Sequence, residues 1–131
     1  MFFSVVIALY NKEAFIKKTL NSVLKQTHTD FEVIIVDDGS TDDSVQIVNK
    51  FNDERIKLYR QLNQGVSVAR NVGVKKAGSN YIALLDADDE WLPNHLEHLL
   101  HLVQIYPDAN FWVSGYRKSI ETPNLSRKPD Q

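Results

Sequence analysis

Short apolar runs rich in β-forming residues alternate with stretches of helical periodicity along most of this 131-residue chain. The pattern predicts strands at residues 3–9, 32–36, 56–59, 81–85 and 111–113, and helices at residues 15–25, 43–51, 66–77 and 93–105. Gly73 interrupts the third helical stretch and weakens that prediction. Because strands that alternate with helices form right-handed βαβ crossovers, we expect an α/β fold whose mostly parallel sheet is flanked by helices.

The composition indicates one domain. A chain of 131 residues with 43% hydrophobic content can build one core but not two, and we place the domain at residues 1–118 with a polar tail or linker at 119–131. The formal charge of −2 provides no basic footprint for nucleic acid, and the lack of cysteine excludes disulfides and thiolate metal sites.

The apolar start of the chain resembles part of a signal peptide but lacks a basic region before it and a small-residue cleavage site after it. No apolar run reaches the roughly 20 residues that a membrane-spanning helix needs. We therefore expect a buried first strand and a cytoplasmic protein. Association of a longer protein with the membrane periphery remains compatible with this sequence.

Polar side chains follow each of the first four predicted strands. Tyr10 and Asn11 end the first, Asp37 and Asp38 the second, the polar segment 60–65 follows the third, and "DADD" at 86–89 follows the fourth. Ligands of open parallel sheets bind beyond the carboxyl ends of the strands, so these groups are expected at one edge.

The two acid pairs, which we expect on neighbouring strand ends, would repel each other unless a cation lay between them. Carboxylates of this kind suit Mg²⁺ or Mn²⁺ completed by the phosphates of a ligand, for which a nucleoside diphosphate is a good candidate. The glycine fingerprint of dinucleotide-binding enzymes and the Walker loop are both absent from the sequence.

Several polar residues also have purely structural interpretations. Ser40, Thr41 or Asp42 can cap the second helix, with Asp42 and Asp43 as acids that favour its N-terminus. Asp89 and Glu90 can do the same for the helix near Pro93. The three histidines at 95, 98 and 101 share that helix with a clear apolar face, which favours a solvated polar side over a metal site. For Arg70, a structural role and a contact with a diphosphate are both open.

Two segments carry a resemblance to a known family. They are "SVVIALYNKEAFIKKTLNSVLKQTHTDFEVIIVDDGSTDDS", residues 4–44, and "NQGVSVARNVGVKKAGSNYIALLDADDEWLPNHLE", residues 63–97. In order and spacing they resemble the N-terminal, nucleotide-sugar-binding part of glycosyltransferase family 2 enzymes, which have the Rossmann-like GT-A fold. The resemblance implies transfer of a sugar from a nucleotide-diphosphate sugar, a UDP-sugar above all, to an acceptor hydroxyl, with Mn²⁺ or Mg²⁺ as cofactor.

The resemblance also implies roles for residues of the first two strand ends. Ala8 and Tyr10 would line the nucleoside pocket, with Tyr10 packed against the base. Asp38 would accept a hydrogen bond from the imide N–H of uracil, and Asp37 would support Asp38 or reach the ribose.

For the diphosphate, the resemblance implies that Arg70 contacts the base or the phosphates. "DADD" is similar to the DxD motif of the family. Asp88 would bind the metal directly, and Asp86 would contact the ribose or the metal through water.

An inverting member of this family needs a general base for the acceptor hydroxyl, and none of the residues named so far resembles it. We expect the base beyond Gln131, in an acceptor-binding half, and hence a chain that is an N-terminal fragment without transfer activity of its own. The acceptor, a saccharide or a lipid-linked group in such a family, cannot be read from this segment.

Three alternatives stay open at this point. A response-regulator receiver domain would use Asp37 and Asp38 as its acid pair and Asp86 as the phospho-acceptor. A haloacid-dehalogenase-type phosphatase would use Asp86 and Asp88 as nucleophile and acid. A non-catalytic nucleotide-sugar-binding module would use the same pocket without chemistry.

Overall fold

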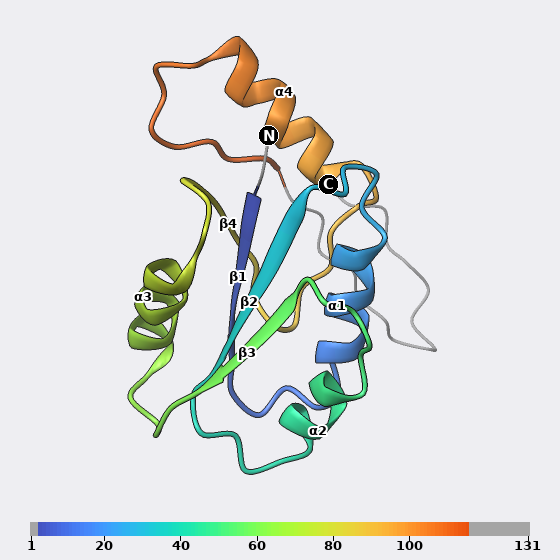
Figure 1. The fold of residues 1–131 in the computed structure, drawn as a ribbon, viewed down its shortest axis with the longest axis vertical. Coiled ribbons are helices and arrows are strands. Elements are labelled where there is room, and N and C mark those ends of the chain that lie inside the picture. The colour runs from blue at the N-terminus through green and yellow to red at the C-terminus, as the bar shows by residue number, and fades with distance from the viewer. Residues whose placement is uncertain (1–2, 116–131) are drawn as a thin grey trace, which may run out of the picture.

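The computed structural model describes residues 3–115, which form a single four-stranded parallel sheet with helices on both faces (Figure 1). The strands run parallel in the order β3-β2-β1-β4. In chain order the elements are β1 (Phe3–Leu9), α1 (Ile16–Leu24), β2 (Phe31–Asp37), α2 (Ser44–Asn49), β3 (Ile56–Arg60), α3 (Val66–Lys76), β4 (Tyr81–Leu84) and α4 (His95–Ile105). The predicted α/β class and parallel sheet are thus confirmed.

The two central strands divide their side chains between two apolar layers, as the two-residue period of a strand requires. Val5, Ile7 and Leu9 of β1 point to one face, where α1, α2 and α4 pack, while Val6 points to the other. That second face is covered by α3 through Ala69, and Figure 1 shows α3 alone on its side of the sheet. Every residue of β2 is buried, which explains its unbroken apolar run.

Gly73 lies where α3 packs closely against the sheet. A Cβ built at this position would collide with Cγ1 of Val6, a fully buried and β-branched neighbour. The glycine that weakened the helix prediction is therefore what lets α3 lie against β1.

Several boundary predictions needed correction. The second helix is only Ser44–Asn49, and α4 begins at His95 after Asn94, so Pro93 lies before the helix and not within its first turn. The fifth strand predicted at 111–113 does not form within the described residues. Phe111 and Val113 are exposed there and pair with no strand.

Two of the three histidines of α4 lie on an exposed face, as expected. His98 and His101 lie on the exposed side of α4, while the ring of His95 stacks on Trp91 with centroids 4.6 Å apart. Among the described residues, no helix is long and apolar enough to cross a membrane. The tail predicted at 119–131 lies outside the described part of the chain.

The strand order places a topological switch point between β1 and β4. The chain moves outward from β1 to β2 and β3, then returns to the opposite side of β1 to form β4. Crevices at such points, beyond the carboxyl ends of the strands, are where open α/β sheets bind ligands. Since β1 lies between β2 and β4, the expectation that the two acid pairs stand on neighbouring strand ends was wrong.

Candidate functional site

A cleft of about 540 Å³ lies beyond the carboxyl ends of β1, β2 and β4. This volume falls within the range of roughly 300–1,000 Å³ found for small-molecule sites. Its lining residues come from the two sides of the switch point and from the loop that leads into α3: Ala8, Tyr10, Lys12, Asp38, Asn63, Gly65, Val66, Arg70, Asp86, Ala87 and Asp88. Segments up to 80 positions apart in the sequence thus meet at one edge of the sheet, as the position of the strand ends requires.

The turn after β1 is fixed by hydrogen bonds to the loop after β2. Asn11 adopts a left-handed conformation (φ 48°), which asparagine tolerates better than most residues. Its side-chain oxygen accepts the N–H groups of Thr41 and Asp42 at 2.8 and 3.3 Å, and its own N–H donates to Ser40 Oγ at 3.0 Å. The next N–H, of Lys12, donates to the buried Ser44 Oγ at 2.8 Å.

These bonds extend the interpretation of Ser40–Asp43 as a helix cap, because the same residues also contact the turn after β1. Asp43 occupies the N-cap position of α2 without a side-chain cap bond. Asp42 accepts the N–H of Ser44 through one oxygen and the N–H of Glu13 through the other. Asp42 thus satisfies an N–H at the start of α2, as predicted, while Ser40 and Thr41 join the loop to the turn after β1.

Asp38 is the most deeply buried carboxylate of the cleft, with 2% of its surface exposed. Its Oδ1 accepts Gln61 Nε2 and the backbone N–H of Gln64, both at 2.8 Å, and its Oδ2 accepts the N–H of Gly65 at 3.0 Å. Burial alone would raise the pKa of Asp38, but these three hydrogen bonds together lower it below its ordinary value. Asp38 therefore stays ionised and holds the loop that begins α3.

Asp37, the preceding residue and the last of β2, is fully buried. It accepts the N–H of Ser40 at 3.2 Å and forms an ion pair with Arg60 Nε at 3.5 Å. It does not line the cleft. Its contacts fit the supporting role expected of it better than a direct contact with a ribose.

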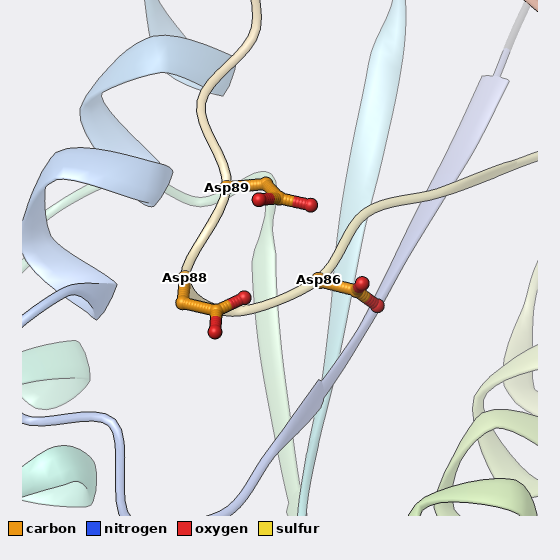
Figure 2. A group of neighbouring side chains, drawn as sticks. All are labelled: Asp86, Asp88 and Asp89. Carbon is orange, nitrogen blue, oxygen red and sulfur yellow. The ribbon is translucent and has the colours of Figure 1, made fainter. Parts of the chain in front are cut away.

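The turn after β4 gathers three carboxylates. Asp86, Asp88 and Asp89 project to the same side of the chain in Figure 2, and one oxygen of each lies within 4.8 Å of the others. Burial, and then the charges of Asp88 and Asp86, raise the pKa of Asp89 above its ordinary value. Since α4 starts only at His95, the interpretation of Asp89 as an acid of that helix was wrong.

Two cations of the chain approach this acidic turn. Arg70 of α3 donates to Asp86 at 2.6 Å, and Lys12 Nζ lies 3.1 Å from Asp88 Oδ2. Carboxylate oxygens that converge in this way are ligands that a hard divalent ion such as Mg²⁺ or Mn²⁺ can use, together with water or phosphate oxygens. The donor set of Asp86, Asp88 and Asp89 thus fits the metal that the sequence suggests.

Comparison with known proteins decides the family. The model of "Glycosyl transferase family 2" matches residues 4–130. The chain belongs to this family. An uncharacterized glycosyltransferase of Nostoc sp. is 41% identical over 104 residues, which cover 77% of this chain and 32% of that protein.

Solved structures of glycosyltransferases share the fold of this family 2 chain. TarS of S. aureus (residues 1–349), in complex with UDP-GlcNAc, superposes with a TM-score of 0.77 at 35% identity over 82% of this chain and 32% of that one. The mannosyltransferase PcManGT of Pyrobaculum calidifontis, in complex with GDP-Man and Mn²⁺, gives a TM-score of 0.73 at 23% identity, over 77% of this chain and 32% of that one. The chain spans about a third of the length of each of these relatives.

Most of the residues that the sequence singled out meet in one place. The lining of the cleft includes six of them: Ala8, Tyr10, Asp38, Arg70, Asp86 and Asp88. Lys12 was not singled out, and neither was any individual residue of the polar segment 60–65, although that segment was recognised as lying at the ligand edge. Asp89 had a visible signal, two consecutive acids after "DA", but was assigned to a helix start.

The receiver and phosphatase alternatives do not survive these findings. A receiver would bring the acid pair beside its phospho-acceptor, yet β1 separates Asp37 and Asp38 from Asp86, and Asp86 is paired with Arg70. Membership of the glycosyltransferase family excludes both as descriptions of this chain.

Proposed function

We propose that this chain is the donor-binding part of a metal-dependent, inverting glycosyltransferase that uses a nucleoside diphosphate sugar, with UDP as the favoured nucleotide. The observation that carries the proposal is the single cleft in which Tyr10, Asp38, Arg70 and Asp88 converge. The complex of TarS with UDP-GlcNAc supports the proposal, because TarS is 35% identical over 82% of this chain.

In this proposal the nucleoside occupies the side of the cleft formed by β1 and β2. The ring of Tyr10, which is partly exposed, packs against the base beside Ala8. Within residues 3–115, Asp38 Oδ2 accepts a single hydrogen bond, from Gly65, and so has capacity for the imide N–H of uracil. Cytosine presents an acceptor at that position, and a buried carboxylate would reject it.

The diphosphate lies toward the turn after β4. Asp86, Asp88 and Asp89 would hold Mn²⁺ or Mg²⁺, and the ion would neutralise the negative charge of the departing diphosphate. Arg70 approaches the same place from α3 and would give the phosphates a forked, charged donor.

Transfer also requires a base that deprotonates the acceptor hydroxyl. Every carboxylate of the cleft is assigned here to the donor or the cation. We therefore assign the base, and the recognition of a saccharide or lipid-linked acceptor, to a part of the whole protein outside this cleft. The 131-residue chain is expected to bind donor without transferring sugar.

Calorimetric titration of UDP into the chain tests the proposal, first with Mn²⁺ and then with EDTA. We expect a dissociation constant of about 10–100 μM, equivalent to roughly −7 to −5.5 kcal/mol, that weakens at least tenfold in EDTA. CDP should bind at least tenfold more weakly than UDP, because the two bases differ in the group that faces Asp38.

Asp88→Asn should abolish the effect of Mn²⁺ on UDP binding. Glu90→Gln is the matched control: it removes one carboxylate two positions along, outside both the acidic turn and the lining of the cleft. A folded chain that binds UDP and CDP equally, or whose Mn²⁺ dependence survives Asp88→Asn, would contradict the proposed arrangement.

A further inference from the structure

Lys12 is the cation of the cleft whose role the proposed function leaves unassigned. Its Nζ lies 3.1 Å from Asp88 Oδ2, and the two side chains are 38% and 40% exposed. An ion pair exposed to this degree is worth about 0–1 kcal/mol, because water competes with it and both side chains lose freedom. The pair can therefore be opened at little cost by a better partner for either side chain.

The backbone of Lys12 is held firmly, in contrast to its ammonium group. Its N–H donates to Ser44 Oγ, and its carbonyl accepts the N–H groups of Phe15 and Ile16 at 3.0 and 2.9 Å. The preceding residue, Asn11, is the left-handed corner that is bonded to the loop after β2. The side chain thus starts from a fixed point at the mouth of the cleft and can move only within its own length.

Two positively charged groups compete for the carboxylate of Asp88 in this proposal, Lys12 and a divalent cation. In the proposed function it binds a divalent ion, which carries twice the charge of the lysine and interacts more strongly with an oxygen ligand. An ion at Asp88 would weaken the attraction between Asp88 and Lys12, and the phosphates of a bound nucleotide would complete its coordination. These phosphates would offer a new partner to Lys12, which lines the same cleft.

We propose that Lys12 is a diphosphate-binding residue which is held by Asp88 in the absence of a divalent cation and transferred to the diphosphate when a cation binds. This inference depends on the proposed function, since it requires both the cation and the nucleotide in the cleft. It adds a residue of the chain to the donor site and a reason for cation and nucleotide to bind cooperatively.

The proposal predicts effects of opposite sign on the two ligands. Without nucleotide, Lys12 competes with the cation for Asp88, so Lys12→Met should bind Mn²⁺ more tightly, by about two- to fivefold. With saturating Mn²⁺, the same variant should bind UDP about five- to twentyfold more weakly, because a charge-assisted hydrogen bond to phosphate is lost. Uridine, which has no phosphate, should bind both proteins equally.

The experiment compares the 131-residue wild-type chain with Lys12→Met, Lys12→Arg and Lys17→Met. Lys17 is an exposed lysine of α1 outside the cleft, so its removal makes the same change in net charge. Mn²⁺ binding is followed by the electron paramagnetic resonance of the free ion, and UDP and uridine binding by calorimetry. Lys12→Arg, which keeps the charge, should recover most of the affinity for UDP.

The possible outcomes distinguish a failure of the role proposed for Lys12 from a failure of the proposed function. A wild-type chain that binds neither Mn²⁺ nor UDP overturns both. A wild-type chain that binds both ligands, with Lys12→Met no different from Lys17→Met, overturns the role of Lys12 and leaves the proposed function standing. Weaker binding of both ligands by Lys12→Met also overturns the exchange, since it would show that Lys12 supports the site without competing for Asp88.

Discussion

Asp38 offers the sharpest test of how the cleft is held together, through the substitution Asp38→Asn. The side chain keeps its size, so the change acts on hydrogen bonds and charge rather than on packing. The single oxygen of asparagine can still accept from Gln61 and Gln64, as Oδ1 does now. The amide nitrogen would then face the N–H of Gly65, a donor against a donor.

The expected cost is about 2–4 kcal/mol of unfolding free energy. Leaving the N–H of Gly65 without its acceptor contributes about 1–3 kcal/mol, and the two remaining bonds each weaken as a charged acceptor becomes neutral. Gln64 and Gly65 are themselves exposed, so water offsets part of the loss. The expected cost is therefore lower than the sum of the unpaired N–H and the two weakened hydrogen bonds. For a domain of this size such a loss is a large fraction of total stability.

Urea denaturation at pH 7 and at pH 3.5 measures both the cost and its origin. The pKa of Asp38 is lowered in the folded chain, so its charge contributes stability above the ordinary aspartate pKa of about 3.9, and that contribution is lost as the pH falls through the folded value. The difference between wild type and Asp38→Asn should therefore shrink on acidification.

Asp43→Asn is the control for this experiment. The side chain of Asp43 belongs to the same loop but makes no cap bond to α2. Its substitution should therefore change the free energy of unfolding by less than about 0.5 kcal/mol. A loss below about 1 kcal/mol for Asp38→Asn, or a loss that is the same at both pH values, would refute the reasoning that charged hydrogen bonds from Asp38 hold the loop before α3.

Other contacts give further predictions. Gly73→Ala should destabilise the chain by about 1–3 kcal/mol in urea denaturation, despite a gain of about 1 kcal/mol in helix propensity, because the new Cβ strikes Val6. Adding Val6→Ala should lower stability by less than the full cost of a core cavity, because it also relieves the clash. If the effects of the two substitutions were strictly additive, the clash would be refuted. Ser4→Ala should cost about 1–3 kcal/mol, since Ser4 Oγ donates to the buried Glu32 at 2.7 Å, and an unchanged urea midpoint would show that water replaces it. Asp89→Asn should weaken Mn²⁺ binding about threefold or more in a resonance titration, whereas equal affinity would remove Asp89 from the ligand set.

The architecture followed from the sequence because its signals are local. The apolar runs of β1 and β2 and the helical spacing of α1 identify the elements, and the right-handed crossover rule orders them into a parallel sheet. The predicted strand at 111–113 shows the limit of this reasoning. Its residues are good strand formers, but a strand exists only where a partner offers hydrogen bonds, and in the described residues Phe111 and Val113 remain exposed.

Within the cleft, strand ends were predictable and partners were not. The place of Asp38 follows from the end of β2, yet its bonds to Gln64 and Gly65 depend on β3 lying beside β2, a fact of the tertiary structure. The ion pair of Lys12 with Asp88 joins residues 76 positions apart, and no pattern in the sequence indicates which lysine reaches that turn. Residues 40–43 were interpreted only as a helix cap, because the turn at Asn11, which they also contact, is distant in the chain.

The two sides of the cleft differ in how they are held, and this difference fits the two parts of the proposed donor. Asp37 and Asp38 are buried and bonded to backbone N–H groups, so the side assigned to the nucleoside is rigid before any ligand arrives. The side chains of Asp86 and Asp88 are about half exposed, and each forms an ion pair with a long, flexible cation, Arg70 and Lys12 respectively. A rigid polar surface can discriminate between bases, because a wrong partner leaves a buried group unpaired. A surface of exchangeable ion pairs can instead adapt as a cation enters and as the diphosphate gains charge during transfer. Substitutions on this side should therefore alter how strongly the cation affects nucleotide binding, without altering the preference for one nucleobase over another.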